Sequence, residues 1–324
     1  MSGYVDRFWR SVDGLRLHAR DYAGAGGDAK LPVICLHGLT RNARDFEDVA
    51  PAMAAQGRRV LAVDVRGRGL SAWTPNPQAY LVPTYAGDII AMAQALGIAR
   101  AVFVGTSMGG LITMVLASMD AELVAAAVVN DIGPEISPVG LARIAGYTGT
   151  ATTIDTWSQA ADYARAINAA AFPGYTPADW LAFARRIFRE RDGKPVLDYD
   201  PDIAAPLRAT PADASPPNLW PLFQRLAQRP VLLIRGALSD LLEVRTSDRM
   251  RADAPTLRFT HVEGVGHAPM LTEPAANWRS RPSSPTSLSR VSQTEAAASF
   301  QSLAWSLQPL GSRRSTHKGS RRPV

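Results

Sequence analysis

The chain is poor in cysteine and has no long apolar run. Cys35 is the only cysteine, so an intrachain disulfide is excluded, and its place in the apolar run 33–36 predicts a buried thiol. No uninterrupted apolar stretch reaches the ~18 residues of a membrane span, and the N-terminal residues lack the apolar centre of a secretory signal. We therefore expect a soluble, cytoplasmic protein that does not bind membranes.

Charge of one sign is in excess only near the C-terminus. The chain has 35 Lys and Arg against 29 Asp and Glu, a formal net charge of +6. Eight of the basic residues but only one acid, Glu295, lie in residues 275–324, which leaves 27 basic and 28 acidic residues in 1–274. A nucleic-acid partner would require a basic face on the folded part, so no nucleic-acid binding is expected.

Short apolar runs alternate with segments of helical spacing. The alternating pattern around Asp13-Gly14 in residues 9–22 predicts a β-hairpin. Helical spacing is expected at 46–56, 85–96 and 110–119. Buried strands are expected at 32–36, 60–63, 101–104, 124–129, 231–234 and 257–262. This alternation predicts an α/β fold with a mostly parallel, doubly wound sheet.

The alternation stops between residues 133 and 226. This segment is helix-like, rich in aromatic residues and punctuated by prolines. We interpret it as a helical cap, or lid, inserted between core segments 1–132 and 227–274; a second small domain with its own aromatic core is the alternative. Residues 275–324 are rich in Ser, Arg and Pro, which predicts a largely disordered basic tail.

The strand expected at 101–104 is followed by Gly105-Thr106-Ser107-Met108-Gly109. Gly-x-Ser-x-Gly between a strand and a helix is typical of a nucleophile elbow, a sharp turn that projects the serine hydroxyl into a cleft. The motif alone is frequent by chance, but its strand-and-helix setting is not. Ser107 is therefore the candidate nucleophile, with Gly105 and Gly109 as the residues that permit the turn.

A serine nucleophile needs a base, and five histidines are available. His267 lies in a glycine-containing loop directly after the last expected strand, where a base can reach over the sheet edge. The others lie in less suitable places: His18 in the hairpin, His37 after the strand 32–36, His261 within a strand and His317 in the tail. His267 is thus the candidate base.

The third catalytic group must orient the histidine, and two aspartates follow strands of the sheet. Asp240 follows the strand 231–234 and preserves the order Ser…Asp…His, so we favour it. Asp131 follows the preceding strand and is the alternative acid, since it reaches the same histidine from a neighbouring strand. Either residue is otherwise an ordinary loop-capping aspartate.

An oxyanion formed during attack by Ser107 requires preformed N–H donors. The backbone N–H of Met108, directly after the serine, is one candidate donor. The loop His37-Gly38-Leu39 after the early strand supplies the second through the N–H of Leu39, with His37 bracing the loop and not transferring protons. A plain structural turn at His37-Gly38 is the alternative.

Together these motifs resemble the α/β-hydrolase superfamily over residues 9–274. They are His37-Gly38-Leu39, Asp64-x-Arg66-Gly67-x-Gly69-x-Ser71, the serine motif, Asp240 and Gly266-His267. The set is most similar to bacterial capped members, which include carboxylesterases, enol-lactonases, haloperoxidase-like esterases and carbon–carbon bond hydrolases. Such relatives continue after Glu273-Pro274 into an amphipathic helix, and this chain departs from them there.

The residues and the resemblance lead to the same expected activity. We expect hydrolysis of carboxylic esters through an acyl-enzyme on Ser107, without a metal or organic cofactor. The expected substrate is a small molecule, a medium-sized apolar or aromatic ester. Cleavage of a carbon–carbon bond in a vinylogous diketone uses the same triad and is the alternative reaction. A ligand-binding protein without turnover is the alternative class. No pattern indicates an oligomeric state.

Overall fold

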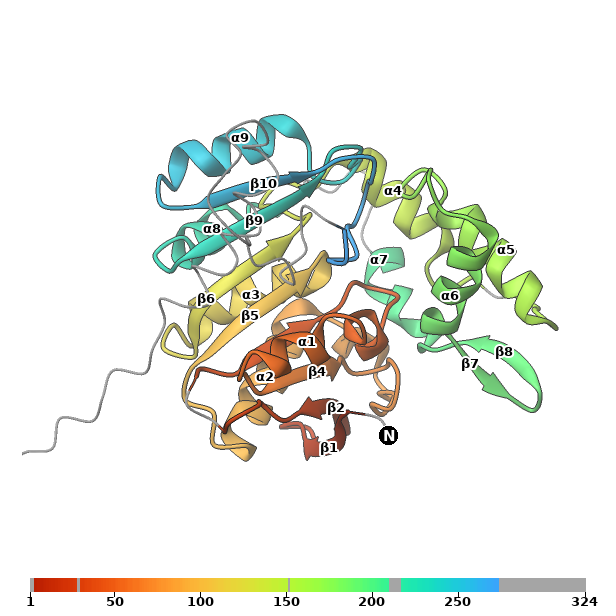
Figure 1. The fold of residues 1–324 in the computed structure, drawn as a ribbon, viewed down its shortest axis with the longest axis horizontal. Coiled ribbons are helices and arrows are strands. Elements are labelled where there is room, and N and C mark those ends of the chain that lie inside the picture. Colours follow the sequence, from red (N-terminus) through yellow and green to blue (C-terminus); the bar gives the residue numbers. More distant parts are fainter. Residues whose placement is uncertain (1–2, 28–29, 151, 210–216, 274–324) are drawn as a thin grey trace, which may run out of the picture.

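The central layer of the computed structural model is an eight-stranded sheet with the order β1-β2-β4-β3-β5-β6-β9-β10 (Figure 1). The structure describes residues 3–27, 30–150, 152–209 and 217–273. The strands are β1 (Val5–Arg10), β2 (Arg16–Tyr22), β3 (Val33–Leu36), β4 (Val60–Asp64), β5 (Ala101–Thr106), β6 (Val124–Asn130), β9 (Val231–Gly236) and β10 (Arg258–Val262).

The sheet is parallel from β4 to β10 and antiparallel only at its N-terminal edge. β1 and β2 form the expected hairpin, and β2 pairs antiparallel with β4. The pairs β3–β4, β3–β5, β5–β6, β6–β9 and β9–β10 are parallel. The predicted fold class, a mostly parallel α/β sheet, is therefore confirmed.

Helices and short 3₁₀ turns connect the strands and continue into the inserted segment. They are η1 (Ala43–Phe46), α1 (Ala50–Ala55), η2 (Pro77–Ala79), α2 (Val82–Ala95), α3 (Met108–Met119), α4 (Pro138–Tyr147), α5 (Trp157–Asn168), α6 (Pro177–Ile187), η3 (Pro201–Ala204), α7 (Ala205–Ala209), α8 (Trp220–Leu226) and α9 (Val244–Asp253). The helix expected at 46–56 is divided into η1 and α1, with Pro51 in the first turn of α1.

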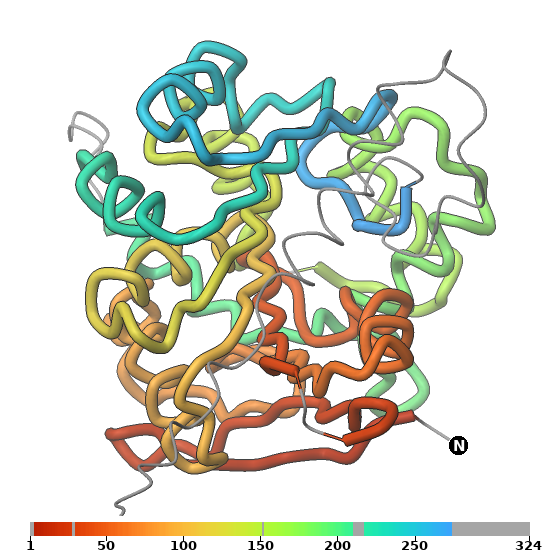
Figure 2. Tube along the Cα trace, turned by 60° about the vertical axis from the view of Figure 1, so that its left-hand side comes forward, coloured from red at the N-terminus to blue at the C-terminus, as the bar shows by residue number. Residues whose placement is uncertain are grey.

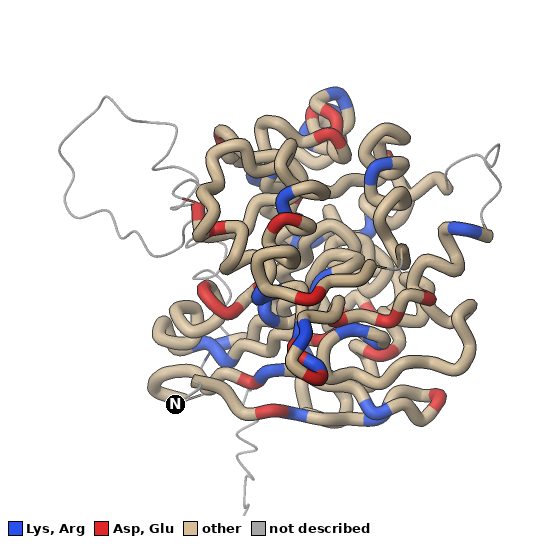
Figure 3. The backbone as a smooth tube through the Cα atoms, turned by 90° about the vertical axis from the view of Figure 1, so that its right-hand side faces the viewer, with Lys and Arg blue, Asp and Glu red and all other residues tan. Residues whose placement is uncertain are grey.

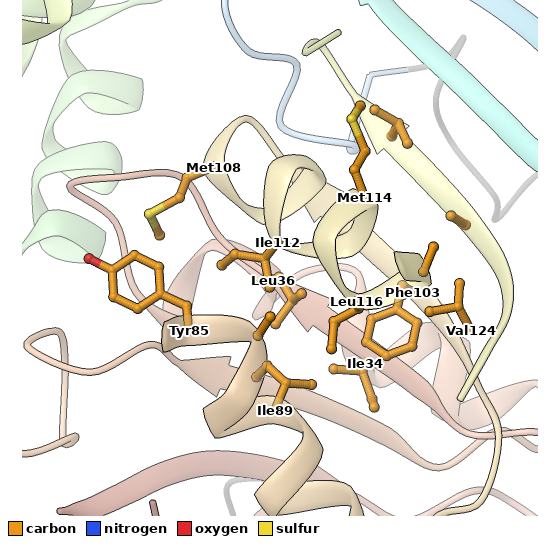
Figure 4. Packing of buried hydrophobic residues seen from close by; sticks show 14 of the residues in the cluster. Ile34, Leu36, Tyr85, Ile89, Phe103, Met108, Ile112, Met114, Leu116 and Val124 are labelled. Carbon is orange, nitrogen blue, oxygen red and sulfur yellow. The ribbon is translucent and has the colours of Figure 1, made fainter. Parts of the chain in front are cut away.

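Successive residues of the central strands serve opposite faces of the sheet. Ile34 and Leu36 of β3 join a cluster with Phe103, α2 and α3, where Ile112 lies among them (Figure 4). Val33 and Cys35 belong to the cluster on the other face, which includes α1. Cys35 is completely buried, as predicted, and burial raises the pKa of its thiol. Burial on both faces explains why these strands are continuous apolar runs.

Residues 133–226 contain the helices α4 to α7, which lie beside one end of the sheet (Figure 1). They also contain an antiparallel hairpin of β7 (Phe188–Arg191) and β8 (Lys194–Leu197). The hairpin was not predicted. Phe172 and Tyr175 stack with centroids 4.5 Å apart and contact Trp180 and Phe183, which forms an aromatic centre within the segment.

Helix α8, at the end of the inserted segment, packs on α3 of the core. Helix α8 lies inside the range assigned to the cap, but its Trp220, Phe223 and Leu226 belong to the same apolar cluster as the sheet and α3. The cap, as we use the term below, is therefore α4 to α7 with the hairpin. The predicted tail, 275–324, lies outside the described residues.

Basic and acidic residues alternate along the backbone traced in Figure 3, and neither kind forms a separate region of the described chain in this view. No helix within the described ranges is both long and apolar enough to cross a membrane.

The N-terminal hairpin is joined to the parallel sheet by a buried histidine. His18 Nδ1 lies 2.7 Å from Asp64 Oδ2, and its Nε2 lies 2.8 Å from Asp6 Oδ1. Both ring nitrogens face carboxylates, which only accept, so both donate and the ring is charged. Burial acts to lower the pKa of His18, but Asp64 and Asp6 outweigh it and raise the pKa above 6.5. For Asp64, burial acts to raise the pKa, but His18 and the N–H groups of Ala43 and Leu70 lower it below 3.8.

This pair makes stability depend on pH in a defined direction. The raised pKa of His18 means that its contribution is complete below pH 6.5 and is lost as the pH rises through the folded-state value. The Asp64 contribution is present above pH 3.8 and is lost as the pH falls through its lowered value.

His18→Gln should therefore lower the free energy of unfolding by about 1–3 kcal/mol near pH 6, because it removes a buried hydrogen-bonding partner. The difference from the wild type should shrink as the pH rises from 6 to 9, measured by urea denaturation. A difference that stays constant or grows over this range would contradict the charged state of His18.

Candidate active site

The serine of the predicted elbow occupies the turn between β5 and α3. Ser107 has φ 52° and ψ −115°, a region that residues with a side chain rarely adopt. Its N–H donates to the carbonyl of Asn130 at the end of β6, 2.9 Å away. The turn is thus held from the neighbouring strand, and it directs the serine side chain into a pocket.

The glycines of the motif are required by close approach of backbone to backbone. A Cβ atom on Gly109 would lie 2.0 Å from the carbonyl oxygen of Leu36, and one on Gly105 would lie 2.4 Å from the carbonyl oxygen of Gly109. These distances are shorter than any real contact, so a side chain at either position would push α3 away from β3 and β5.

His267 connects Ser107 to an acid through a chain of two hydrogen bonds. Its Nε2 lies 2.9 Å from Ser107 Oγ, and its Nδ1 lies 2.8 Å from Asp131 Oδ2. The carboxylate only accepts, so Nδ1 donates to it and Nε2 of the neutral ring is left to accept from the serine hydroxyl. The structure therefore brings Ser107 and His267 together, as the sequence predicts.

Asp131 is completely buried and held on all sides by donors. Its Oδ1 accepts from the Gly236 N–H at 2.8 Å, and its Oδ2 accepts from the Ser239 hydroxyl at 2.6 Å as well as from His267. The aspartate itself has φ 56° directly after β6. These fixed donors orient the carboxylate toward His267.

The structure does not join the preferred acid, Asp240, to His267, because this carboxylate is bound elsewhere. Arg143 of α4 donates to it twice, from Nε to Oδ2 at 2.6 Å and from Nη2 to Oδ1 at 2.8 Å. Burial acts to raise the pKa of Asp240, but Arg143 outweighs it and lowers the pKa below its usual value. His267 Nδ1 instead donates its hydrogen bond to the rival residue Asp131.

The loop after β3 is braced by His37 and Arg68. His37 is buried; its Nδ1 donates to the Gly38 carbonyl at 2.7 Å and its Nε2 accepts from the Val65 N–H at 3.1 Å. Burial lowers the pKa of His37 to about 4, so the ring is neutral and cannot act as a second charged group. The buried Arg68 donates from Nε to the Leu39 carbonyl at 3.0 Å.

The two backbone amides predicted for the oxyanion, those of Leu39 and Met108, both lie near Ser107. Leu39 and Ser107 line the same pocket. Met108 is the first residue of α3, where backbone N–H groups have no partner within the helix. Both amides predicted for an oxyanion site thus belong to segments that the structure holds next to Ser107.

The pocket itself lies between the core and the cap. The segment after β10, coloured blue in Figure 2, runs toward the cap, where the Gly266 N–H donates to the Ala171 carbonyl at 2.7 Å. The pocket wall combines polar and apolar surface in similar amounts. The cap and this segment contribute the apolar lining residues Ile144, Ile167, Phe172, Phe183, Ile187, Met270 and Leu271.

Four contributing residues were missed by sequence reasoning. Ser239 holds Asp131, Arg68 holds the Leu39 loop, Arg143 binds Asp240, and Arg41 lines the pocket. A motif that includes Arg68, between Gly67 and Gly69, was recognised, but its side chain was not assigned a function. Within the described ranges, no group of three or more His, Cys, Asp or Glu side chains is arranged to hold a metal.

The sheet order and the elbow are those of a known class. The family model for the α/β hydrolase fold matches residues 32–274, so the chain belongs to the α/β-hydrolase family. It is 35% identical to the 3-hydroxybutyrate-oligomer hydrolase of Cupriavidus necator over 276 residues, which are 83% of this chain and 93% of that protein. The chain is therefore a hydrolase of this family.

Solved structures agree with this assignment. An α/β hydrolase from Novosphingobium aromaticivorans is 41% identical with a TM-score of 0.81, covering 94% of this chain and 99% of that one. A putative hydrolase from Rickettsia typhi is 27% identical with a TM-score of 0.71, covering 80% and 87%.

The two aspartates offer a matched test of which one orients His267. Asp131→Asn should reduce the rate of labelling by a fluorophosphonate probe by roughly 10³- to 10⁴-fold, because an amide N–H facing Nδ1 favours the wrong tautomer. Asp240→Asn should change the rate less than about fivefold, since it weakens only a partly exposed ion pair.

Circular dichroism and thermal unfolding of both variants check that the fold is retained. A large loss in Asp240→Asn together with near-normal labelling of Asp131→Asn would reverse the assignment.

Proposed function

We propose that the protein hydrolyses carboxylic esters by acyl transfer through Ser107. The observation that carries this proposal is the continuous chain from Ser107 Oγ through the His267 ring to Asp131, with both distances below 3 Å. This geometry supports roles for Ser107 as nucleophile, His267 as base and Asp131 as orienting acid in attack on a carbonyl carbon.

In the first half-reaction His267 Nε2 takes the proton of Ser107 as Oγ bonds to the ester carbonyl carbon. The carbonyl oxygen becomes an oxyanion, for which we propose the N–H groups of Leu39 and Met108 as donors. The carbon–oxygen bond to the leaving alcohol then breaks, and His267 returns the proton to that alcohol. An acyl group remains on Ser107.

In the second half-reaction a water molecule attacks the acyl carbon while His267 takes one of its protons. Collapse of the second tetrahedral intermediate releases the carboxylic acid, and Ser107 recovers its proton from His267. Asp131 stabilises the imidazolium in both halves and keeps its own proton state throughout.

The pocket and the relatives support an ester of short apolar acids. Aliphatic and aromatic side chains of the cap form part of its wall and suit alkyl substituents. The relative that shares 35% identity acts, by its name, on oligomers of 3-hydroxybutyrate, in which each link is an ester. We therefore propose short hydroxy-acid oligoesters as the substrates; an aromatic ester remains a second substrate for assay.

Ser107→Ala should abolish both fluorophosphonate labelling and hydrolysis of p-nitrophenyl butyrate, with kcat lower by about 10⁴-fold or more. Ser158→Ala, which changes an exposed serine on α5, is the matched control and should behave as the wild type. Equal labelling of the Ser107→Ala variant and the wild type would refute the nucleophile.

A ring-cleavage diketone in the same assay separates ester from carbon–carbon hydrolysis. Turnover of the diketone without turnover of any ester would replace the ester proposal.

A further inference from the structure

Arg41 is a cation on the pocket wall for which the ester chemistry described above has no use. It lies two residues beyond Leu39 and lines the same pocket as Ser107. The space beside Gly38 shows that the side chains of Arg41 and Ser107 lie near each other. A Cβ atom there would lie 3.5 Å from Arg41 Cγ and 3.7 Å from Ser107 Cβ.

One edge of the Arg41 guanidinium is held in place. Its Nε and Nη2 donate to the same oxygen of Asp45, Oδ1, at 2.8 and 2.6 Å. The group also lies over the ring of Phe183, with Cζ 4.1 Å from the centroid, and its Nη2 is 3.6 Å from Met270 Sδ. The guanidinium is thus fixed by the loop, the cap and the segment after β10.

The other edge is available to a ligand. Within the described part of the chain, the hydrogen bonds of this guanidinium come from Nε and Nη2, and Nη1 donates none. The side chain as a whole is 15% exposed, and Nη1 is not among the buried polar atoms of the described residues that lack a partner. Its N–H groups therefore face the solvent of the pocket, and a carboxylate of the substrate can replace that water as their acceptor.

Arg41 is the cation of this pocket, whereas the hydroxyl and amide groups beside it, such as Thr40 and Asn168, are uncharged. Apart from His267, the charged residues among those that line it are Arg41 and Asp45. Because Asp45 compensates the charge of Arg41, recognition relies on the directed N–H pair of Nη1 more than on net charge. Tyr147 lies on the same wall: burial raises its pKa, while the charges of Arg143 and Arg41 act to lower it.

We propose that Arg41 binds the free carboxylate of a hydroxy-acid oligoester and thereby selects the terminal ester bond for cleavage. The inference rests on the proposed ester hydrolysis. In such an oligomer the free carboxylate belongs to the unit whose hydroxyl is esterified, so it leaves with the alcohol. A 3-hydroxy acid places only two carbons between the ester oxygen and its carboxylate, which suits a guanidinium one short loop away from the serine.

The test compares two substrates that differ only in charge. One is the dimer of 3-hydroxybutyrate, which is anionic, and the other is the same dimer with its carboxylate converted to a neutral primary amide. The wild type should show a higher kcat/KM for the acid than for the amide. Arg41→Gln should lower that preference about 10- to 100-fold, mainly through KM for the acid. Arg41→Lys should keep part of it, because the charge remains while the planar pair of N–H groups is lost.

Arg165→Gln is the matched control, since Arg165 is exposed on α5 and pairs with Asp162 away from the pocket lining. It should leave the acid-to-amide ratio at the wild-type value. Thermal unfolding of each variant tests whether the loop and cap still pack.

The outcomes separate this inference from the proposed function. A wild type with equal kcat/KM for acid and amide overturns the inference. An Arg41→Gln variant in which kcat/KM falls equally for both substrates also overturns it, because that result indicates a purely structural contact with Phe183 and Met270. Turnover of p-nitrophenyl butyrate without turnover of either dimer also overturns it but leaves ester hydrolysis intact. Ser107→Ala with wild-type activity would instead refute the proposed function itself.

Discussion

The site depends on the turn at Ser107, where β5 passes directly into α3. A non-glycine residue at φ 52° costs on the order of 1–3 kcal/mol. The helix that follows buries Ile112, Met114 and Leu116 against the sheet, and each buried side chain of this size contributes about 1.5–3 kcal/mol. Packing of α3 is therefore sufficient to hold the strained turn. Because the Ser107 N–H is bound by Asn130, whose neighbour is Asp131, the same contact between β5 and β6 also sets the distance from nucleophile to acid.

The parts of the fold that the sequence predicts are those with a strong local signal. The core strands are continuous apolar runs because both of their faces are covered, and the elbow is visible because Gly105 and Gly109 have no room for a side chain. The β7–β8 hairpin lacks this signal, since its residues include Arg189, Glu190 and Arg191, and it was missed. Helix α8 was assigned to the cap because its place on α3 is a long-range contact that no local spacing reveals.

The choice between Asp131 and Asp240 shows where sequence reasoning ends. Both aspartates follow strands whose carboxyl ends meet at one edge, so chain order favours one without excluding the other. The structure decides through partners distant in sequence: Ser239 and the Gly236 N–H bind Asp131, whereas Arg143 from the cap binds Asp240. An aspartate bound twice by an arginine is a poor partner for a histidine that must gain and lose a proton, because its charge is already compensated. Asp131 is therefore the partner of His267 because Asp240, the neighbouring carboxylate, is already bound by Arg143.

The loop of residues 37–41 carries both the proposed oxyanion donor, Leu39, and the proposed carboxylate-binding residue, Arg41. Arg68 donates to the Leu39 carbonyl and so fixes the backbone at Leu39. Arg41 follows two residues later on the same loop. A loop shift of about 1 Å that spoils an oxyanion donor would also move the guanidinium, since both are carried on one short stretch of backbone. Asp45 and Phe183 restrain Arg41 from the far side, so the cap takes part in placing it. A carboxylate bound there would in turn hold the substrate ester at a fixed distance from Ser107, so that the group that recognises the substrate also aligns its carbonyl for attack.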